Sequence, residues 1–286
     1  MTWNNKYWDA LDQLYWWPRY LGLRSIPQKH WEKHDGRISV PAELVNKSGP
    51  LYSRERNVRE LKSYLHGSEE ILNHIFDLTF AIAPDAMINE VLLRPLGFDD
   101  PGPFESIGRE SAKRYGWGEF DNVTQHDGLY VSEQSAVGVE LKLLSSSWPE
   151  QIIKYAALLT WEEMHKGSRE QLGLLFIVPE TAIRNHWSSC GLEEASVNKS
   201  FLETKWKRKL PKAISGLLGS HREHVASVLD RMKLGVISWE ELRHKMNTLQ
   251  NSLDMTHRGD QTLSRLISGF LTQLEDHRDT GINQEA

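Results

Sequence analysis

The pattern of hydrophobic and polar residues predicts two adjacent strands in the middle of the chain. The segments 123–131 and 136–144 are rich in apolar residues, and only four residues separate them. In the second segment, valine and leucine alternate with Gly138, Glu140 and Lys142, and a period of two is typical of a strand with two different faces. We therefore predict a hairpin whose apolar face packs against a helix and whose polar face lines an open edge or cleft.

Helices are predicted on both sides of this hairpin. Apolar residues recur at helical spacing, with serine, proline or glycine at the ends, in three segments: 68–83, 84–97 and 149–165. The continuous apolar run 173–179 predicts a buried strand. Glycine and proline interrupt residues 98–120, which are predicted to be irregular. The middle of the chain therefore has the order helix, strand, strand, helix and strand.

The two ends of the chain differ from this middle. After residue 180 the sequence is predicted to be almost wholly helical, in four segments: 196–218, 220–234, 238–254 and 258–277. Ser238 and Glu241 form a capping-box pattern at the start of the third segment. Five of the eleven tryptophans lie in the first 31 residues. We interpret them as part of a helix packed on the domain, with a base-stacking surface as the alternative.

Composition narrows the class of protein. Of the 286 residues, 39% are hydrophobic and 26% are charged, which suits a folded domain and excludes collagen-like, globally disordered and disulfide-rich classes. Cys190 is the only cysteine, so an intramolecular disulfide and a cysteine-based zinc site are excluded. Nothing approaches the ~18 consecutive apolar residues of a membrane span, and the first residues lack signal-peptide features. We expect a cytoplasmic protein that does not enter a membrane.

Charge is distributed unevenly along the chain. Residues 61–180 carry 9 basic and 19 acidic residues, whereas the segments on either side are mildly basic. An acidic middle between basic flanks suits a cation-binding centre whose flanks hold a polyanion. The alternative interpretation is that the acidic residues coat solvated helix faces.

The predicted hairpin places two carboxylates opposite each other. Asp127 and Glu140 are equidistant from the centre of a four-residue turn at 132–135, so their Cβ atoms are expected ~4.5–5.5 Å apart. Facing carboxylates destabilise a sheet unless a cation compensates, and oxygen ligands favour Mg²⁺ or Mn²⁺ over zinc. Lys142 then stands beside the cation, where it would orient or deprotonate a water or stabilise a transition state. The alternative is an ordinary hairpin with a charged solvent face.

The pattern resembles the PD-(D/E)XK nuclease superfamily. Asp127 matches the first acidic position of that family, with His126 where a proline is often found, and Glu140–Lys142 matches the (D/E)XK element. On the following helix, Gln151 and Tyr155 lie four residues apart on one face and match the QxxxY element of some branches. The resemblance covers roughly two fifths of the chain.

The resemblance implies a fold, a reaction and a set of roles. The fold is α/β, with a restriction-endonuclease-like α/β/α sandwich core, a small mixed sheet and helical additions at both ends. The reaction is metal-dependent hydrolysis of phosphodiester bonds, with DNA as the expected substrate and a 5′-phosphate on the product. Asp127, Glu140 and the carbonyl of Leu141 would bind Mg²⁺ or Mn²⁺, and Lys142 would assist the attacking water. Glu90 would complete the metal site.

Some assignments stay open within this interpretation. The glutamates that stand as alternatives to Glu90 are Glu105, Glu110 and Glu119. Gln151 and Tyr155 would touch the substrate or steer Lys142, or they are plain core residues. The chain is divided into a Trp-rich region, a nuclease-like core and a helical region, at 1–66, 67–182 and 183–286.

A basic cluster and the C-terminal helices suggest partners. The cluster surrounds Trp206 and is expected to contact nucleic acid through Lys205, Lys207, Arg208, Lys209 and Lys212, unless it is an exposed helix face. Leucine stripes around 234–253 and 263–274 suggest a homodimer or protein-partner surface. A non-catalytic nucleic-acid-binding or protein-assembly module that keeps the fold is therefore the alternative function. An RNA-directed enzyme of the same fold is a third.

Overall fold

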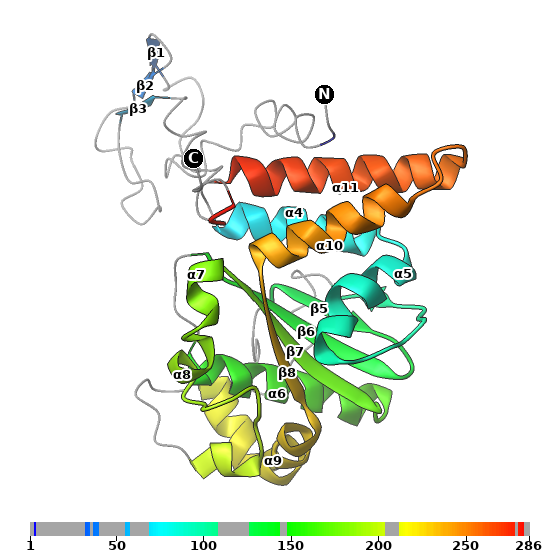
Figure 1. Cartoon of the computed structure of the whole chain (residues 1–286). Helices are drawn as coiled ribbons and strands as arrows, with labels where there is room; N and C mark the ends of the chain where they lie inside the picture. Colours follow the sequence, from blue (N-terminus) through cyan, green and yellow to red (C-terminus); the bar gives the residue numbers. More distant parts are fainter. Residues whose placement is uncertain are drawn as a thin grey trace.

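A mixed five-stranded sheet with helices on both faces forms the centre of the protein (Figure 1). The computed structural model describes residues 3, 32–34, 37–39, 55–57, 69–107, 126–143, 148–203, 212–277 and 280–282. The sheet has the strand order β4-β5-β6-β7-β8, and its strands are Glu105–Ser106, Gly128–Val131, Ser135–Leu141, Gln171–Val178 and Lys233–Ser238. A separate antiparallel sheet consists of β1, β2 and β3, at Glu32–His34, Arg37–Ser39 and Glu55–Asn57.

The direction of the strands changes at β6. Strand β5 runs antiparallel to both β4 and β6, whereas β6, β7 and β8 run parallel to one another. Gly128 pairs with Val139, and the same register continued by one residue places Asp127 opposite Glu140. The predicted register of the hairpin is therefore confirmed. The carboxyl ends of the three parallel strands lie at one edge of the sheet, where open α/β sheets commonly bind ligands.

One face of the sheet is covered by helices from both halves of the chain. These are α4 (Glu69–Ala81), α5 (Asp85–Ile88), α10 (Trp239–Ser252) and α11 (Arg258–Asp276). The chain continues from α5 through a π-helical turn, Asn89–Leu93, and a 3-10 turn, Arg94–Leu96, to Gly97. Phe76 and Phe80 of α4 pack against Phe270 of α11 with ring centroids 6.0 Å apart in both pairs. The aromatic contacts tie α11 to α4 in one core.

The other face is covered by α6 (Pro149–Lys166) and α9 (Lys212–Arg231). Three short helical segments complete this layer, namely α7, α8 and a 3-10 segment, at Glu180–Ile183, His186–Ser189 and Lys199–Glu203. The predicted helix 149–165 corresponds to α6, and each end of α6 lies within one residue of the predicted end. Helix α9 contains a kink at His221, where φ and ψ are −129° and 24°.

Strand β8 corrects the prediction that the chain after residue 180 is almost wholly helical, because it lies between two of the predicted helices. It pairs with β7 inside the main sheet, so the sheet does not end at the predicted boundary of residue 182. A Cβ atom on Gly235 would lie 2.8 Å from Leu96 Cδ2, which shows how closely the 3-10 turn packs on this strand. This contact joins residues far apart in the sequence, so local spacing does not reveal it. Strand β4 likewise supplies a strand within the segment 98–120 that was predicted to be irregular.

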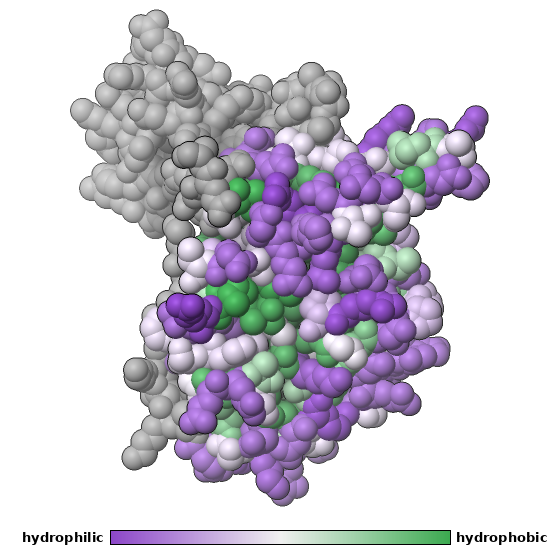
Figure 2. Space-filling model, viewed as in Figure 1, coloured by the Kyte–Doolittle hydropathy of each residue, from purple (hydrophilic) through white to green (hydrophobic). Residues whose placement is uncertain are grey.

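The leucine stripes of the C-terminal helices face the interior of the protein. Leu242 of α10 and Leu271 and Leu274 of α11 are buried in the core that includes α4. Figure 2 shows mainly hydrophilic residues on the outer side of α10 and α11. These buried leucines therefore give no support to the expectation that the stripes form a partner or dimer surface, which stays a prediction.

At the N-terminus, Trp3 is the only one of the five clustered tryptophans among the described residues, and its indole N–H donates to the carbonyl of Leu266 at 2.9 Å. The rest of the predicted aromatic helix lies outside the described residues. None of the helices in the described parts of the chain is long and apolar enough to cross a bilayer.

Candidate active site

Five of the residues singled out by the sequence meet at the edge where the parallel strands end, namely Asp127, Glu140, Lys142, Gln151 and Tyr155. Asp127 directly precedes β5, Glu140 is the second-last residue of β6, and Lys142 follows that strand. Helices α4 and α6 both begin near this edge. Residues of their first turns, Glu69 and Gln151, therefore contact the cluster. The relative exposures of Asp127, Glu140 and Lys142 are only 6%, 7% and 8%. Charged groups this deeply buried must be paired.

Helix α6 covers the polar face of the hairpin. Every residue of β6 is buried, and the ring of Tyr155 lies against Gly138, where a Cβ atom would overlap it. The prediction that this face lines an open cleft is therefore wrong at Gly138. The missing side chain of that glycine makes room for Tyr155, which brings a phenol to the strand beside Glu140.

Both carboxylate oxygens of Asp127 accept hydrogen bonds from the protein. The side-chain amide of Asn73 on α4 donates to Oδ1 at 2.8 Å, and the backbone N–H of Leu141 donates to Oδ2 at 2.9 Å. One donor comes from the helix and the other from the adjacent strand. Together they hold the carboxylate in one orientation.

Both carboxylate oxygens of Glu140 are bound by α6. Tyr155 Oη lies 2.9 Å from Oε2, and Gln151 Nε2 donates to Oε1. The backbone N–H of Trp148 donates to Gln151 Oε1 at 3.0 Å, which orients the amide so that its NH₂ group points at the carboxylate. In the described structure, Gln151 and Tyr155 thus act on Glu140 rather than on Lys142.

The hydroxyl of Tyr155 joins the two strands of the hairpin. Besides Glu140, it lies 2.5 Å from the carbonyl oxygen of Val139 and accepts from the backbone N–H of Asp127 at 3.3 Å. Complete burial, followed by the negative charges of Glu140 and Asp127, raises the pKa of Tyr155 well above its ordinary value. The phenol is therefore neutral and serves as a hydrogen-bond donor.

Lys142 carries the positive charge of the cluster. Its Nζ lies 2.6 Å from Glu140 Oε1 and 3.7 Å from Glu69 Oε1. Burial lowers the pKa of Lys142, but the charge and hydrogen bond of Glu140, with smaller contributions from neighbouring carboxylates, raise it by more, so the net shift is upward. The amine is therefore protonated in this arrangement, which favours charge stabilisation over proton abstraction.

The backbone of Lys142 is held from two further elements. Its N–H donates to the carbonyl of Ile177 in β7 at 2.9 Å, and its carbonyl accepts from the indole N–H of Trp239 at 2.8 Å. Trp239 is the first residue of α10 and is fully buried. The C-terminal part of the chain thus helps to position the lysine.

Glu90 does not join this cluster. Its side chain is half exposed and forms an ion pair with Arg94, one turn later, at 2.9 Å. The expectation that Glu90 completes the site is corrected by the position of Glu69, whose carboxylate approaches Lys142 from the first turn of α4. Glu105 lies in β4 at a cavity described below, and Glu110 and Glu119 are outside the described residues.

Helix α4 contributes polar residues that the sequence pattern alone did not reveal. Glu69, Asn73 and Asp77 are spaced by four residues and therefore lie on one face of the helix. Asn73 is only 2% exposed, although it is polar. The four-residue spacing of Glu69, Asn73 and Asp77 is the sequence signal that would have pointed to this stripe.

Most of the basic residues that are expected to contact nucleic acid lie outside the described residues. Lys205, Lys207, Arg208 and Lys209 lie outside the described residues, and Lys212 begins α9. Helix α9 packs on the layer that also contains α6. The expectation of nucleic-acid contact at this cluster therefore stays a prediction.

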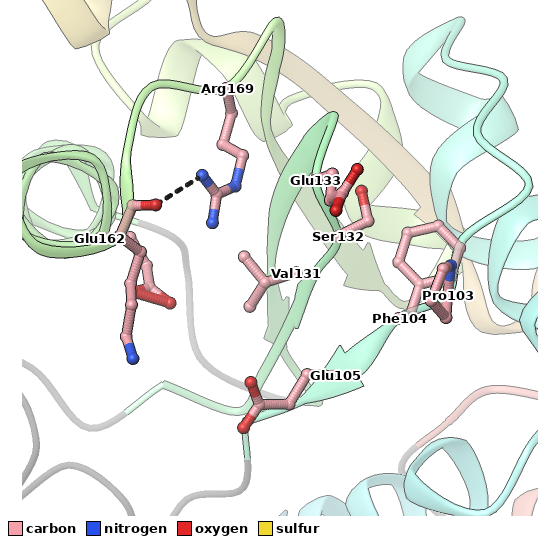
Figure 3. A pocket seen from close by; sticks show the side chains of 9 residues that line it. Pro103, Phe104, Glu105, Val131, Ser132, Glu133, Glu162 and Arg169 are labelled. Carbon is pink, nitrogen blue, oxygen red and sulfur yellow. Dashed lines mark hydrogen bonds between the residues drawn. The ribbon is translucent and has the colours of Figure 1, made fainter.

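A cavity of about 490 Å³ lies at the opposite end of the hairpin (Figure 3). Its walls combine carboxylates, two basic side chains and apolar groups, from Pro103, Phe104, Glu105, Val131, Ser132, Glu133, Glu162, Lys166 and Arg169. It includes the turn of the hairpin, whereas Asp127 and Glu140 are at the open end of the same two strands. The cavity and the carboxylate–lysine cluster are therefore separate features.

The cluster offers oxygen atoms of the kind that hard divalent cations prefer. Two carboxylates and backbone carbonyls offer oxygen ligands only, and Mg²⁺ commonly uses one or two carboxylates while keeping several waters. Among the described residues, no group of three or more His, Cys, Asp or Glu side chains is placed to hold a metal ion. Within the described residues, the two facing carboxylates are therefore not part of a larger set of metal-binding side chains.

Comparison with known proteins does not assign the chain to a family. No family model, no curated protein and no solved structure matches it. The functional interpretation therefore depends on the geometry of the cluster itself.

Proposed function

We propose that this protein is a metal-dependent nuclease of the PD-(D/E)XK type, with DNA as its substrate. The observation that carries the proposal is the pairing of Asp127 with Glu140 across the hairpin, with Lys142 Nζ 2.6 Å from Glu140 Oε1. Two carboxylates and an ammonium group are the combination that phosphodiester hydrolysis needs, because charge develops on both the phosphate and the attacking water.

Each residue has a role that follows from its contacts. Asp127, Glu140 and the carbonyl of Leu141 would hold Mg²⁺ or Mn²⁺, which supplies Lewis-acid activation of the phosphate and of a water. Gln151 and Tyr155 hold the carboxylate of Glu140 in place.

Lys142 is protonated and therefore stabilises negative charge on the phosphate or orients the attacking water. Glu69 balances the charge of Lys142 from α4. Because Lys142 is already paired with Glu140, a bound cation would have to share this carboxylate with the lysine.

The proposed fold is restriction-endonuclease-like. Helix α4 precedes three antiparallel strands, α6 crosses the sheet, and β7 lies parallel to β6. This order supports the proposal because it brings the hairpin, the QxxxY helix and an upstream helical glutamate to one edge.

The test is cleavage of a substrate panel. The panel contains supercoiled plasmid, linear duplex, single-stranded DNA and RNA, each with Mg²⁺, Mn²⁺ or EDTA. Glu140→Ala and Lys142→Ala are compared with the wild type and with Glu90→Gln as a matched control away from the cluster. We expect metal-dependent cleavage by wild type and Glu90→Gln only. Equal cleavage by all four folded proteins would place the activity elsewhere.

A non-catalytic binding or assembly module is the second candidate. The observation that favours it is that protein donors already occupy both oxygens of Asp127 and of Glu140, as in a purely structural polar network. Retention of nucleic acid or of a protein partner by the wild type, without cleavage or cation binding, would support this candidate over the nuclease.

A further inference from the structure

Helix α4 buries an amide that the roles above do not use. Asn73 is 2% exposed, and its Nδ2 donates to Asp127 Oδ1 at 2.8 Å across 54 residues of sequence. Its Oδ1 is buried and has no hydrogen-bond donor within the described part of the chain. Leaving a buried polar atom unpaired costs about 1–3 kcal/mol, so an amide at this position requires an explanation.

The two donors to Asp127 differ in kind. The Leu141 N–H belongs to the backbone of β6 and holds Oδ2, whereas Asn73 is the side-chain donor that holds Oδ1. The backbone donor holds one oxygen from the strand, and the amide holds the other oxygen from the helix. The amide of Asn73 therefore sets the plane of the Asp127 carboxylate from α4.

We propose that Asn73 is a positioning residue that orients the carboxylate of Asp127 for a divalent cation, through the hydrogen bond that its Nδ2 donates to Oδ1. The proposal rests on the proposed function, because it requires Asp127 to be a cation ligand. Partners that orient metal ligands typically change metal affinity or activity 10–100-fold when removed. Asn73 therefore controls cation affinity without touching the substrate.

The test measures Mn²⁺ binding directly by isothermal titration calorimetry. Asn73→Leu keeps the approximate shape of the side chain and removes both polar groups, and Asn73→Ala removes the side chain beyond Cβ. Thr79→Val is the matched control, because Thr79 is a buried polar residue of α4 that donates to its own helix at Ile75 O, 2.7 Å away. Thermal unfolding of each variant is measured in the same buffer.

We expect the Kd for Mn²⁺ to rise about 10–100-fold in both Asn73 variants and to stay unchanged in Thr79→Val. In cleavage assays, the Mg²⁺ concentration for half-maximal rate should rise in parallel, while saturating Mg²⁺ restores most of the rate. A role in stability alone would lower Tm without this shift in metal dependence.

The outcomes separate this inference from the nuclease proposal. Wild-type Mn²⁺ binding and cleavage, with unchanged Kd in folded Asn73 variants, would overturn the inference and leave the nuclease intact. The absence of Mn²⁺ binding in the wild type would overturn both. Failure of both Asn73 variants to fold, while Thr79→Val folds, would assign Asn73 to stability and overturn the inference.

Discussion

The ring of Tyr155 lies against the backbone of Gly138, and its hydroxyl reaches Glu140 Oε2 at 2.9 Å. This contact joins α6 to β6 at the position where the strand has no side chain. The contact explains how Glu140 is held on the polar face of β6. The alternating pattern of the strand alone predicts that this face is open.

The first prediction follows from the space over Gly138. Gly138→Ala places a methyl group into the Tyr155 ring, and overpacking of this kind typically costs about 1–3 kcal/mol of unfolding free energy. Chemical denaturation measures the change. Gly219→Ala is the control, because nothing lies within 4 Å of a Cβ there, and it should leave stability unchanged or raise it by about 1 kcal/mol. Equal changes in unfolding free energy for the two substitutions would contradict the packing of Tyr155 on Gly138.

The second prediction concerns the hydroxyl of Tyr155. Tyr155→Phe keeps the ring and removes the hydrogen bond to Glu140, so unfolding free energy should fall by about 1.5–3 kcal/mol, the usual value for a bond to a charged group. A double-mutant cycle with Glu140→Gln isolates the interaction. Additive effects in that cycle would show that the two side chains are not coupled.

The third prediction separates the two helical glutamates. Glu69→Gln removes a negative charge 3.7 Å from Lys142 Nζ, and we expect it to reduce the cleavage rate about tenfold through an altered lysine position. Glu90→Gln removes an exposed charge paired with Arg94 and should leave the rate unchanged. Rates are measured at saturating Mg²⁺. A larger loss in Glu90→Gln than in Glu69→Gln would restore the assignment expected from the sequence.

The fourth prediction concerns acid stability. Burial lowers the pKa of His186 from 6.5 to about 4, so between these values the unfolded chain binds a proton that the folded chain does not. Stability therefore falls as pH decreases from 6.5 to 4, by up to about 3 kcal/mol.

His186→Phe tests this dependence, because the ring of His186 already packs 4.5 Å from that of Phe176, measured between centroids. Urea unfolding at pH 7, 6, 5 and 4 should show a shallower loss of stability in the variant. Parallel curves for the two proteins would mean that His186 does not titrate in this range.

Part of the site could be predicted because it is local in sequence. A four-residue turn and a period of two place Asp127 opposite Glu140, and helical spacing places Gln151 and Tyr155 on one face. These relationships involve neighbouring elements only, and they determine most of the carboxylate cluster.

The missed features depend on long-range packing. The pattern of α4 does not specify which strand it meets, so the contact of Asn73 with Asp127 was not predicted. Strand β8 forms where Gly235 packs under Leu96, which is distant in the chain. The covered face at Gly138 was also missed, because a glycine in a strand does not by itself indicate which side chain packs against it.

Mn²⁺ binding to the wild type and to Glu140→Gln tests the central claim most directly. Glu140→Gln keeps the shape of the side chain and removes one of the two facing charges. The account predicts one bound Mn²⁺ in the wild type, loss of that binding in the variant, and a parallel loss of metal-dependent phosphodiester cleavage. A wild type that binds no Mn²⁺, or a folded variant that binds it equally well, would contradict the account.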